Sequence, residues 1–243
     1  FVAEASGLRA ERDIILLDQR GTGYSSPDLR CVEFNELYST LSMQNPTLEE
    51  QIALEVQAAE QCRDRLLGEG VNLAAYNSAA NAADVNDLRM ALGYSTLNLY
   101  GFSYGSRLAL TVMRDFPEGV RSAVLDSALP LQADWWEEQP ANVARAYSTL
   151  FAGCANDPAC HAAYPELESH FYALVDRYNE TPLVVEVPDA TTGVAVPQLF
   201  SGDDIVAGGF DALYDSTLIA YLPLAIEQIY AGNTDVIAGL AGE

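Results

Sequence analysis

The chain has 243 residues, a formal net charge of -23 at pH 7, and hydrophobic residues at 49% of its positions. This apolar content can bury a sizeable core and argues against a disordered chain. The negative charge argues against binding to nucleic acid and to anionic membrane surfaces, because both need basic patches on the protein. No uninterrupted apolar run approaches the ~20 residues needed to span a bilayer.

The first half of the chain alternates predicted strands with predicted helices. A continuous apolar run, as in Ile14 to Leu17, is typical of a strand covered on both faces. The alternation predicts an α/β fold with a mainly parallel sheet and helices on both of its faces. Strands are expected at 13–17, 96–100 and 122–125, and helices at 47–66, 80–92 and 107–116.

Two of these helices have recognisable ends. Thr47 begins the first, with Glu50 three residues later in the position of a capping box. Gly93 follows the second, where a glycine commonly stops a helix.

After Pro130 the pattern becomes mainly helical. One hairpin interrupts it, and its two prolines, Pro188 and Pro197, suit the edges of a sheet. We therefore expect a first domain at 1–130 and a mostly helical insertion at 131–243. Within the insertion, helices are expected at 135–151, 162–178, 203–213 and 218–230, and the hairpin near 183–197.

The four cysteines are Cys31, Cys62, Cys154 and Cys160. No two are spaced as C-x-x-C, and with two histidines they form no usual zinc pattern. The apolar face of the 47–66 helix includes Cys62, which suits a disulfide. The even number suggests the pairs Cys31–Cys62 and Cys154–Cys160, with four buried free thiols as the alternative. Disulfides would favour an oxidising location.

The segment Gly101 to Gly105 reads G-x-S-x-G, the pattern of a nucleophile elbow. A predicted strand enters it and an amphipathic helix leaves it, which is the context that the motif requires. Ser103 is then the nucleophile, and the backbone N–H of Tyr104 points at the oxyanion. We expect both glycines to be small because side chains there would crowd the turn. The alternative is an ordinary glycine-rich turn with a surface serine.

Three stretches resemble the prolyl-iminopeptidase and tripeptidyl-aminopeptidase family of α/β-hydrolases. They are DQRGTGYSSP at 18–27, AADVNDLRMALGY at 82–94 and LNLYGFSYGSRLAL at 97–110. The cysteines at 31 and 62 and the CANDPAC segment are similar to the secreted tripeptidyl-aminopeptidase branch. The resemblance implies an α/β-hydrolase core, a cap after Pro130, and an exopeptidase that acts at a free N-terminus.

The resemblance also assigns roles to single residues. It implies that Ser103 is the nucleophile, that Tyr104 N–H is one oxyanion donor, and that Asp18 to Gly23 form a loop at the rim of the site. A purely structural role is the alternative for that loop. The family's His-Gly-Gly-Pro-Gly-like segment is absent, and its acid and histidine lie beyond the cap. We therefore expect the chain to lack parts of the core at both ends and to be inactive alone.

Few residues of the chain could replace the missing acid and histidine. His161 and His170 are its two histidines, and each is expected to have a structural or surface role. Asp126, at the end of the strand after the elbow helix, is a candidate acid that could orient a histidine. A missing downstream acid is the favoured alternative.

Acidic residues of the cap are natural partners for the ammonium group of a substrate. Glu137 and Glu138, next to Trp135 and Trp136, are the candidates. The alternative is that Asp134 caps a helix and Glu137 closes a capping box.

The predicted reaction is acyl transfer in two steps, which needs no metal and no organic cofactor. The expected partner is a peptide with a free N-terminus, and the expected location is secreted or otherwise extracytoplasmic. A carboxylesterase or lipase is one alternative, although an ester substrate has no ammonium to match an acidic cap. A non-catalytic binding protein on the same fold is the other. The sequence predicts no oligomeric state.

Overall fold

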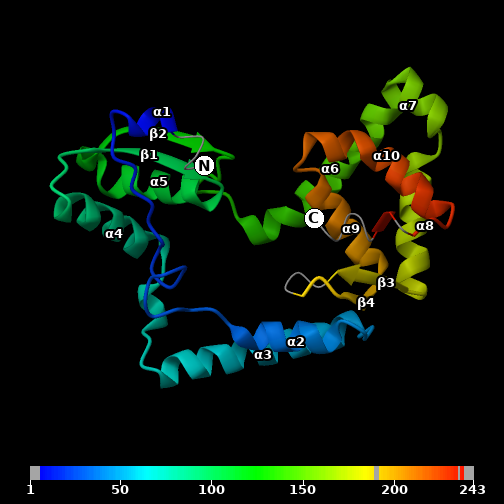
Figure 1. Ribbon diagram of the computed structural model, residues 1–243, viewed down its shortest axis with the longest axis horizontal. Helices are drawn as coiled ribbons and strands as arrows, with labels where there is room; N and C mark the ends of the chain where they lie inside the picture. Colours follow the sequence, from blue (N-terminus) through cyan, green and yellow to red (C-terminus); the bar gives the residue numbers. More distant parts are fainter. Residues whose placement is uncertain (1–5, 189–191, 235, 238–243) are drawn as a thin grey trace. The chain divides into compact units, whose positions relative to one another are not determined.

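The computed structural model describes residues 6–188, 192–234 and 236–237, and it divides into two compact units (Figure 1). Unit 1 comprises the described parts of Phe1–Glu33 and Gln57–Ala133, and unit 2 those of Phe34–Val56 and Asp134–Glu243. The assignment of a core to 1–130 and a cap to 131–243 stays a prediction. In the part of the chain that the structure describes, no helix is long and apolar enough to cross a membrane.

Unit 1 is built around two parallel strands, β1 and β2, joined through helix α5. In their register Leu99 pairs with Ala123 and Phe102 pairs with Asp126. Helix α5 packs against both strands and against α4, and this contact buries a small apolar core that includes Ala82 and Leu108. The elements are α1 (Ser6–Arg9), η1 (Leu73–Ala75), α4 (Ser78–Ala91), β1 (Leu97–Phe102), α5 (Tyr104–Asp115), η2 (Pro117–Gly119) and β2 (Val120–Asp126).

The strand predicted at 13–17 is wrong. These residues lie outside any strand or helix, and the side chains of Ile15, Leu16 and Leu17 are 37%, 67% and 41% exposed. An apolar run becomes a strand only where a neighbouring strand supplies hydrogen-bond partners. Among the described residues of unit 1, only β1 and β2 pair.

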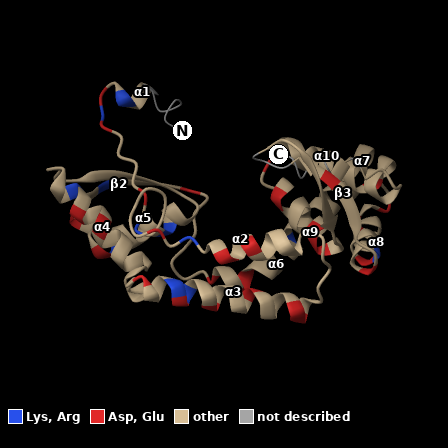
Figure 2. Cartoon of the chain, turned by 60° about the horizontal axis from the view of Figure 1, so that its bottom comes forward, with Lys and Arg blue, Asp and Glu red and all other residues tan. Residues whose placement is uncertain are grey.

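Two of the divisions between the units fall within helices, α2 (Val32–Leu41) and α3 (Leu48–Gly68). The sequence did not predict α2. The capping box of α3 is confirmed, because Glu50 N–H donates to Thr47 Oγ1 over 3.3 Å and Thr47 N–H donates to Glu50 Oε2 over 2.9 Å. Asp and Glu residues occur on the helices of both units (Figure 2).

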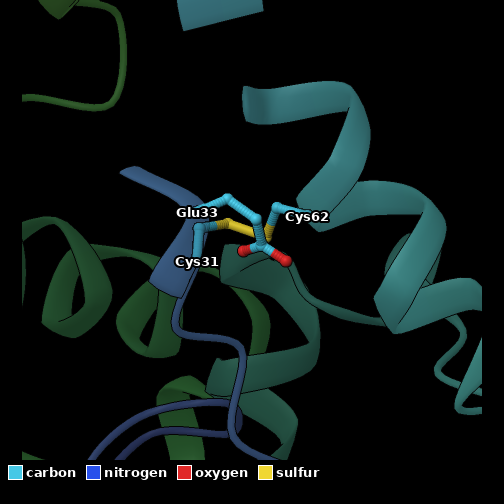
Figure 3. A group of neighbouring side chains, drawn as sticks. All are labelled: Cys31, Glu33 and Cys62. Atoms are coloured by element: carbon cyan, nitrogen blue, oxygen red, sulfur yellow. A yellow bond between two sulfur atoms is a disulfide. The ribbon is translucent and has the colours of Figure 1, made fainter. Parts of the chain in front are cut away.

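Both predicted disulfides are confirmed. Cys31–Cys62 joins the start of α2 to the middle of α3, with a Cα–Cα distance of 5.3 Å. Cys154–Cys160 joins two successive helices, with a Cα–Cα distance of 5.1 Å. Glu33 lies close enough to the first pair to suggest a three-residue metal site (Figure 3). The two sulfurs are bonded to each other, so they provide no thiolate for a metal.

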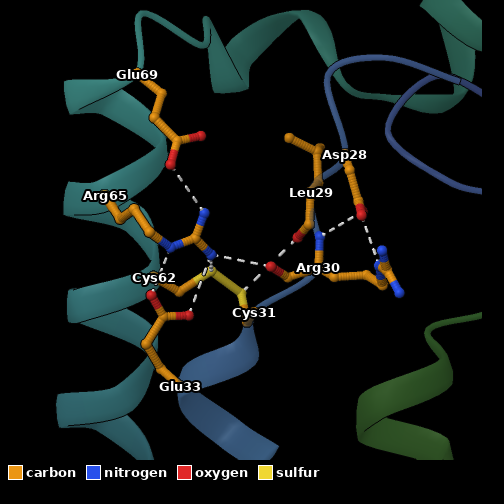
Figure 4. Close-up of a disulfide and its surroundings, with 8 residues drawn as sticks. All are labelled: Asp28, Leu29, Arg30, Cys31, Glu33, Cys62, Arg65 and Glu69. Atoms are coloured by element: carbon orange, nitrogen blue, oxygen red, sulfur yellow. Dashed lines mark hydrogen bonds and ion pairs between the residues drawn. A yellow bond between two sulfur atoms is a disulfide. The ribbon is translucent and has the colours of Figure 1, made fainter.

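An arginine on α3 reinforces the first disulfide (Figure 4). Arg65 donates to both carboxylate oxygens of Glu33, over 2.7 and 3.2 Å, and to the carbonyl of Arg30 over 2.9 Å. These bonds hold the pKa of the Glu33 carboxyl below its usual value. The segment before α2 is therefore fixed to α3 by a covalent bond, and the first turn of α2 is fixed to α3 by a forked ion pair.

We expect removal of the two disulfides to have unequal effects on stability. In the chain-entropy model, loops of 31 and 6 residues correspond to about 4 and about 2 kcal/mol. Urea unfolding of the Cys31→Ser/Cys62→Ser and Cys154→Ser/Cys160→Ser double variants measures both losses. An equal loss, or a larger loss for the second pair, would contradict the loop-length argument.

The described residues of unit 2 form a set of helices with one β-hairpin. The predicted hairpin is confirmed, with β3 antiparallel to β4 and Glu186 paired with Pro197. Its core includes Tyr147, Phe171 and Leu174, and Leu199 N–H donates to the carbonyl of Ser42 over 2.9 Å. The elements from 134 onward are α6 (Trp135–Asn156), α7 (Pro158–Ala163), α8 (Leu167–Glu180), β3 (Leu183–Pro188), β4 (Ala195–Phe200), α9 (Gly202–Ala212) and α10 (Ser216–Tyr230).

Candidate active site

Ser103 is the single residue between the end of β1 and the start of α5. Its backbone has φ +52° and ψ -121°, a conformation that L-residues rarely adopt and that functional turns often hold. Its N–H donates to the carbonyl of Asp126 over 3.0 Å, and its carbonyl accepts from Ser106 N–H over 2.9 Å. The strained turn is thus fixed on both sides, and Ser103 itself is exposed.

The two glycines of the motif differ in their surroundings. A Cβ on Gly101 would lie 2.3 Å from the carbonyl oxygen of Gly105, so no other residue fits there without moving the backbone. A Cβ on Gly105 would meet no described atom within 4 Å. The expectation of crowding is confirmed at Gly101 and wrong at Gly105, because the α5 backbone approaches β1 on one side only.

Tyr104 has two polar groups beside the elbow, its backbone N–H and its side-chain hydroxyl. As the first residue of α5, its backbone N–H has no acceptor inside the helix. Its hydroxyl lies 2.9 Å from Ser78 Oγ at the start of α4. The side chain therefore ties the elbow to α4, and the role of the N–H as an oxyanion donor stays a prediction.

Hydrogen bonds within the segment hold together the loop that begins at Asp18. Tyr24 N–H donates to the Asp18 carboxylate over 2.8 Å, and Ser25 Oγ donates to the Asp18 carbonyl over 2.7 Å. Gly23 has φ +55°, and a Cβ there would lie 2.3 Å from that carboxylate. Asp18 therefore organises the loop, which supports the structural interpretation of this segment.

The same loop is bound to α4. Arg20 donates to both carboxylate oxygens of Asp84, over 2.7 and 2.6 Å, and to the carbonyl of Ala75 over 2.7 Å. Asn81 Nδ2 donates to Gln19 Oε1 over 3.0 Å. Arg20 and Asp84, from two of the sequence stretches that resemble the aminopeptidase family, are thus in contact. Helix α4 includes Asp84 and also Ser78, which contacts the Tyr104 hydroxyl.

Sequence reasoning missed two polar residues directly after the motif. Ser106 is fully buried; its Oγ donates to the Ser103 carbonyl over 2.6 Å and accepts from Leu129 N–H over 2.8 Å. Arg107 fixes the end of unit 1. The signal for both residues was a polar side chain at the start of an amphipathic helix. The guanidinium of Arg107 donates to the carbonyls of Pro130, Leu131 and Ala133 over 2.9, 3.0 and 3.1 Å.

Asp126 ends β2 beside the elbow. Its carboxylate accepts a hydrogen bond from Tyr100 OH over 2.7 Å, and no histidine contacts it among the described residues. The next residue, Ser127, also has φ +52°. A role for Asp126 in orienting a histidine stays a prediction.

His170 and His161 lie in unit 2. His170 Nδ1 is 2.8 Å from Glu227 Oε1, and its ring stacks on Tyr230 with centroids 3.8 Å apart. His161 lies exposed in the last turn of α7. The contacts of His170 fit a structural role in joining α8 to α10.

The start of α6 has a reciprocal cap. Asp134 Oδ1 accepts from the N–H groups of Trp136 and Glu137, over 3.1 and 3.2 Å. The return bond comes from Asp134 N–H to Glu138 Oε1 over 3.2 Å, so Glu138 rather than Glu137 closes the cap. Glu137 has no side-chain partner among the described residues and is exposed.

The fold and the elbow define a class of protein. The chain belongs to the alpha/beta hydrolase fold family, which it matches over residues 2–202.

Among curated proteins, the chain is 26% identical to the serine protease Hip1 of Mycobacterium tuberculosis, over 94% of this chain and 45% of that protein. It is 32% identical to carboxylesterase B of the same organism, over 91% of this chain and 42% of that protein. It is 31% identical to the tripeptidyl aminopeptidase of Streptomyces lividans, over 51% of this chain and 24% of that protein. The chain therefore spans less than half the length of these relatives.

Proposed function

We propose that the protein is a serine hydrolase that cleaves peptide bonds near a free N-terminus through an acyl-enzyme. The observation that carries the proposal is the backbone of Ser103, held at φ +52° between β1 and α5. Membership of the alpha/beta hydrolase family supports the reaction type. The relatives named serine protease and tripeptidyl aminopeptidase favour a peptide substrate.

In the proposed reaction, Ser103 Oγ attacks the carbonyl of the scissile bond while a histidine takes its proton. The N–H of Tyr104 donates to the oxyanion, where a fixed donor stabilises charge that forms only in the transition state. The bond from Ser106 Oγ to the Ser103 carbonyl holds the turn in place. The histidine then protonates the leaving amine, and water releases the acyl group.

Glu137 is the candidate partner of the substrate ammonium. It lies in the first turn of α6, and the helix cap leaves its carboxylate unpaired because Glu138 supplies the return bond to Asp134. A carboxylate in this state can accept the hydrogen bonds of an ammonium group. We infer that Glu137 contributes more than Glu138 to selection of a free N-terminus.

The two disulfides support a secreted or otherwise extracytoplasmic location, because such bonds persist in oxidising compartments.

A carboxylesterase is the second candidate, favoured by the 32% identity to the relative of that name. The two functions differ in whether a positive charge on the substrate matters. An acyl-enzyme forms in both, so the nucleophile alone does not separate them.

We expect the complete protein to hydrolyse a tripeptidyl p-nitroanilide with a free amine faster than its N-acetylated form and faster than p-nitrophenyl butyrate. Loss of one charge-assisted contact in Glu137→Gln should raise KM for the free-amine substrate by about tenfold. The acetylated substrate should be unaffected. Glu168→Gln, an exposed acid in the first turn of α8, is the matched control. Hydrolysis of the ester alone would favour the carboxylesterase.

A further inference from the structure

The segment that follows β2, residues 127–133, contains no helix and no strand. It begins next to the elbow, because Asp126 at the end of β2 accepts the hydrogen bond from Ser103 N–H over 3.0 Å. Its first residue, Ser127, has the same φ of +52° as Ser103. Strained conformations of this kind persist only where the surrounding contacts over-determine them. The contacts that hold this segment therefore bear on the geometry of the nucleophile.

One of these contacts is the hydroxyl of Ser106, which bonds to the segment and to the elbow. Its oxygen accepts from Leu129 N–H over 2.8 Å, and an N–H cannot accept in return. The hydroxyl hydrogen is therefore directed to the Ser103 carbonyl, 2.6 Å away. The same carbonyl also accepts from Ser106 N–H over 2.9 Å, so two bonds from one residue orient it. Because Ser106 is fully buried, solvent water has no access to the hydroxyl.

The next residue of α5 holds the rest of the segment. Arg107 donates to the carbonyls of Pro130, Leu131 and Ala133 over 2.9, 3.0 and 3.1 Å. Its guanidinium presents several donors in a fixed planar fork, which a lysine ammonium lacks. Ser106 and Arg107 thus bind one continuous segment from adjacent positions of one helix, and both contacts lie inside unit 1.

We propose that Ser106 and Arg107 are positioning residues for the reaction of Ser103, and that they act as one clamp through the segment 127–133. The clamp holds the segment beside the elbow, and Ser106 passes this constraint to the Ser103 carbonyl. The inference rests on the proposed function for the identity of the nucleophile, and it adds the residues that set the position of that nucleophile. A displacement of about 1 Å at a reacting group can slow its reaction by about a hundredfold.

The rate at which Ser103 reacts with an organofluorophosphonate tests the proposal, in the complete protein and at a temperature where every variant is folded. This rate reports on the nucleophile itself, whether the natural substrate is a peptide or an ester. We expect Ser106→Ala to react about tenfold to a hundredfold more slowly. With a substrate, kcat should fall by a similar factor and KM should stay unchanged, because a fully buried side chain does not contact the substrate.

Two changes on the same helix are the matched controls. Thr111→Val removes a buried hydroxyl that donates to the carbonyl of Arg107 over 2.8 Å and not to the segment. Arg114→Gln removes an exposed guanidinium that pairs with Asp115, and it changes the net charge by the same amount as Arg107→Gln. Both controls should react at the rate of the unchanged protein, whereas Arg107→Gln should react about threefold to tenfold more slowly.

Combining the two changes separates one clamp from two independent contacts. The double variant Ser106→Ala/Arg107→Gln should react at most about twofold more slowly than Ser106→Ala alone, because the effects of residues that act through one segment do not add. If Ser106→Ala does not fold, the comparison of Arg107→Gln with Arg114→Gln decides the question by the same measurement.

Two results would overturn the inference. One is an equal rate for either variant and its control, Ser106→Ala with Thr111→Val or Arg107→Gln with Arg114→Gln. The other is a double variant that is slowed by the full product of the two single effects. If the rates are as expected but the complete protein hydrolyses no peptide, the proposed function fails and the positioning role stands. Label on a different serine, with Ser103 unmodified, would remove both.

Discussion

Replacement of Ser103 by alanine is expected to lower kcat of the complete protein by about 10⁶-fold, a loss typical of removing a serine nucleophile. The acyl-enzyme cannot form without the hydroxyl, and the Tyr104 N–H would then stabilise only a slow attack by water. Stability should change little, because the Ser103 side chain is exposed and α5 begins without a side-chain cap from it.

An organofluorophosphonate provides the direct measurement, with mass spectrometry to locate the label. Ser127 is the matched control because it follows the adjacent strand and has the same φ of +52°. Ser127→Ala should retain labelling and turnover. Label on Ser127, with Ser103 unmodified, would show that the nucleophile is misassigned.

Alanine at the two glycines of the elbow is expected to have opposite effects. Gly101→Ala places a methyl group 2.3 Å from a backbone oxygen and 2.7 Å from the backbone nitrogen of Ser106. Neither atom belongs to a flexible side chain, so β1 and α5 must separate at the turn. We expect a loss of about 3 kcal/mol in the free energy of unfolding, at the upper end for overpacked sites, and loss of labelling at Ser103.

Gly105→Ala should instead stabilise the protein by about 0.5–1 kcal/mol, because alanine favours a helix over glycine and the described structure leaves the space open. Chemical unfolding of both variants measures the difference. If Gly105→Ala destabilised the protein as much as Gly101→Ala, the close approach of β1 to α5 would not explain the need for glycine at position 101.

Features with a local cause were predictable from the sequence. The capping box of Thr47 and Glu50, the hairpin near Pro188 and Pro197, and the strand–turn–helix at Ser103 each depend on residues close together in the chain. Their hydrogen bonds and turn conformations are set by neighbours a few positions away. The elbow belongs to this group, which is why its strand–turn–helix geometry was predictable without a structure.

Features that depend on distant partners were predicted less well. The run from Ile14 to Leu17 has the composition of a buried strand, yet it pairs with no described strand. One local detail also differed from its motif: the return bond of the α6 cap comes from Glu138, one residue beyond the expected position. Arg107 was overlooked because the carbonyls that it binds, at 130–133, lie more than twenty positions away.

The sequence by itself predicted Ser103 as the nucleophile, and it predicted the alpha/beta hydrolase fold and the pairing of the cysteines, which are confirmed. Only the tertiary structure decided that Gly101 and not Gly105 must lack a side chain, and that Ser106 and Arg107 bind the segment after β2. Periodicity and turn chemistry act along the chain, whereas steric exclusion and burial depend on which atoms meet when distant segments pack.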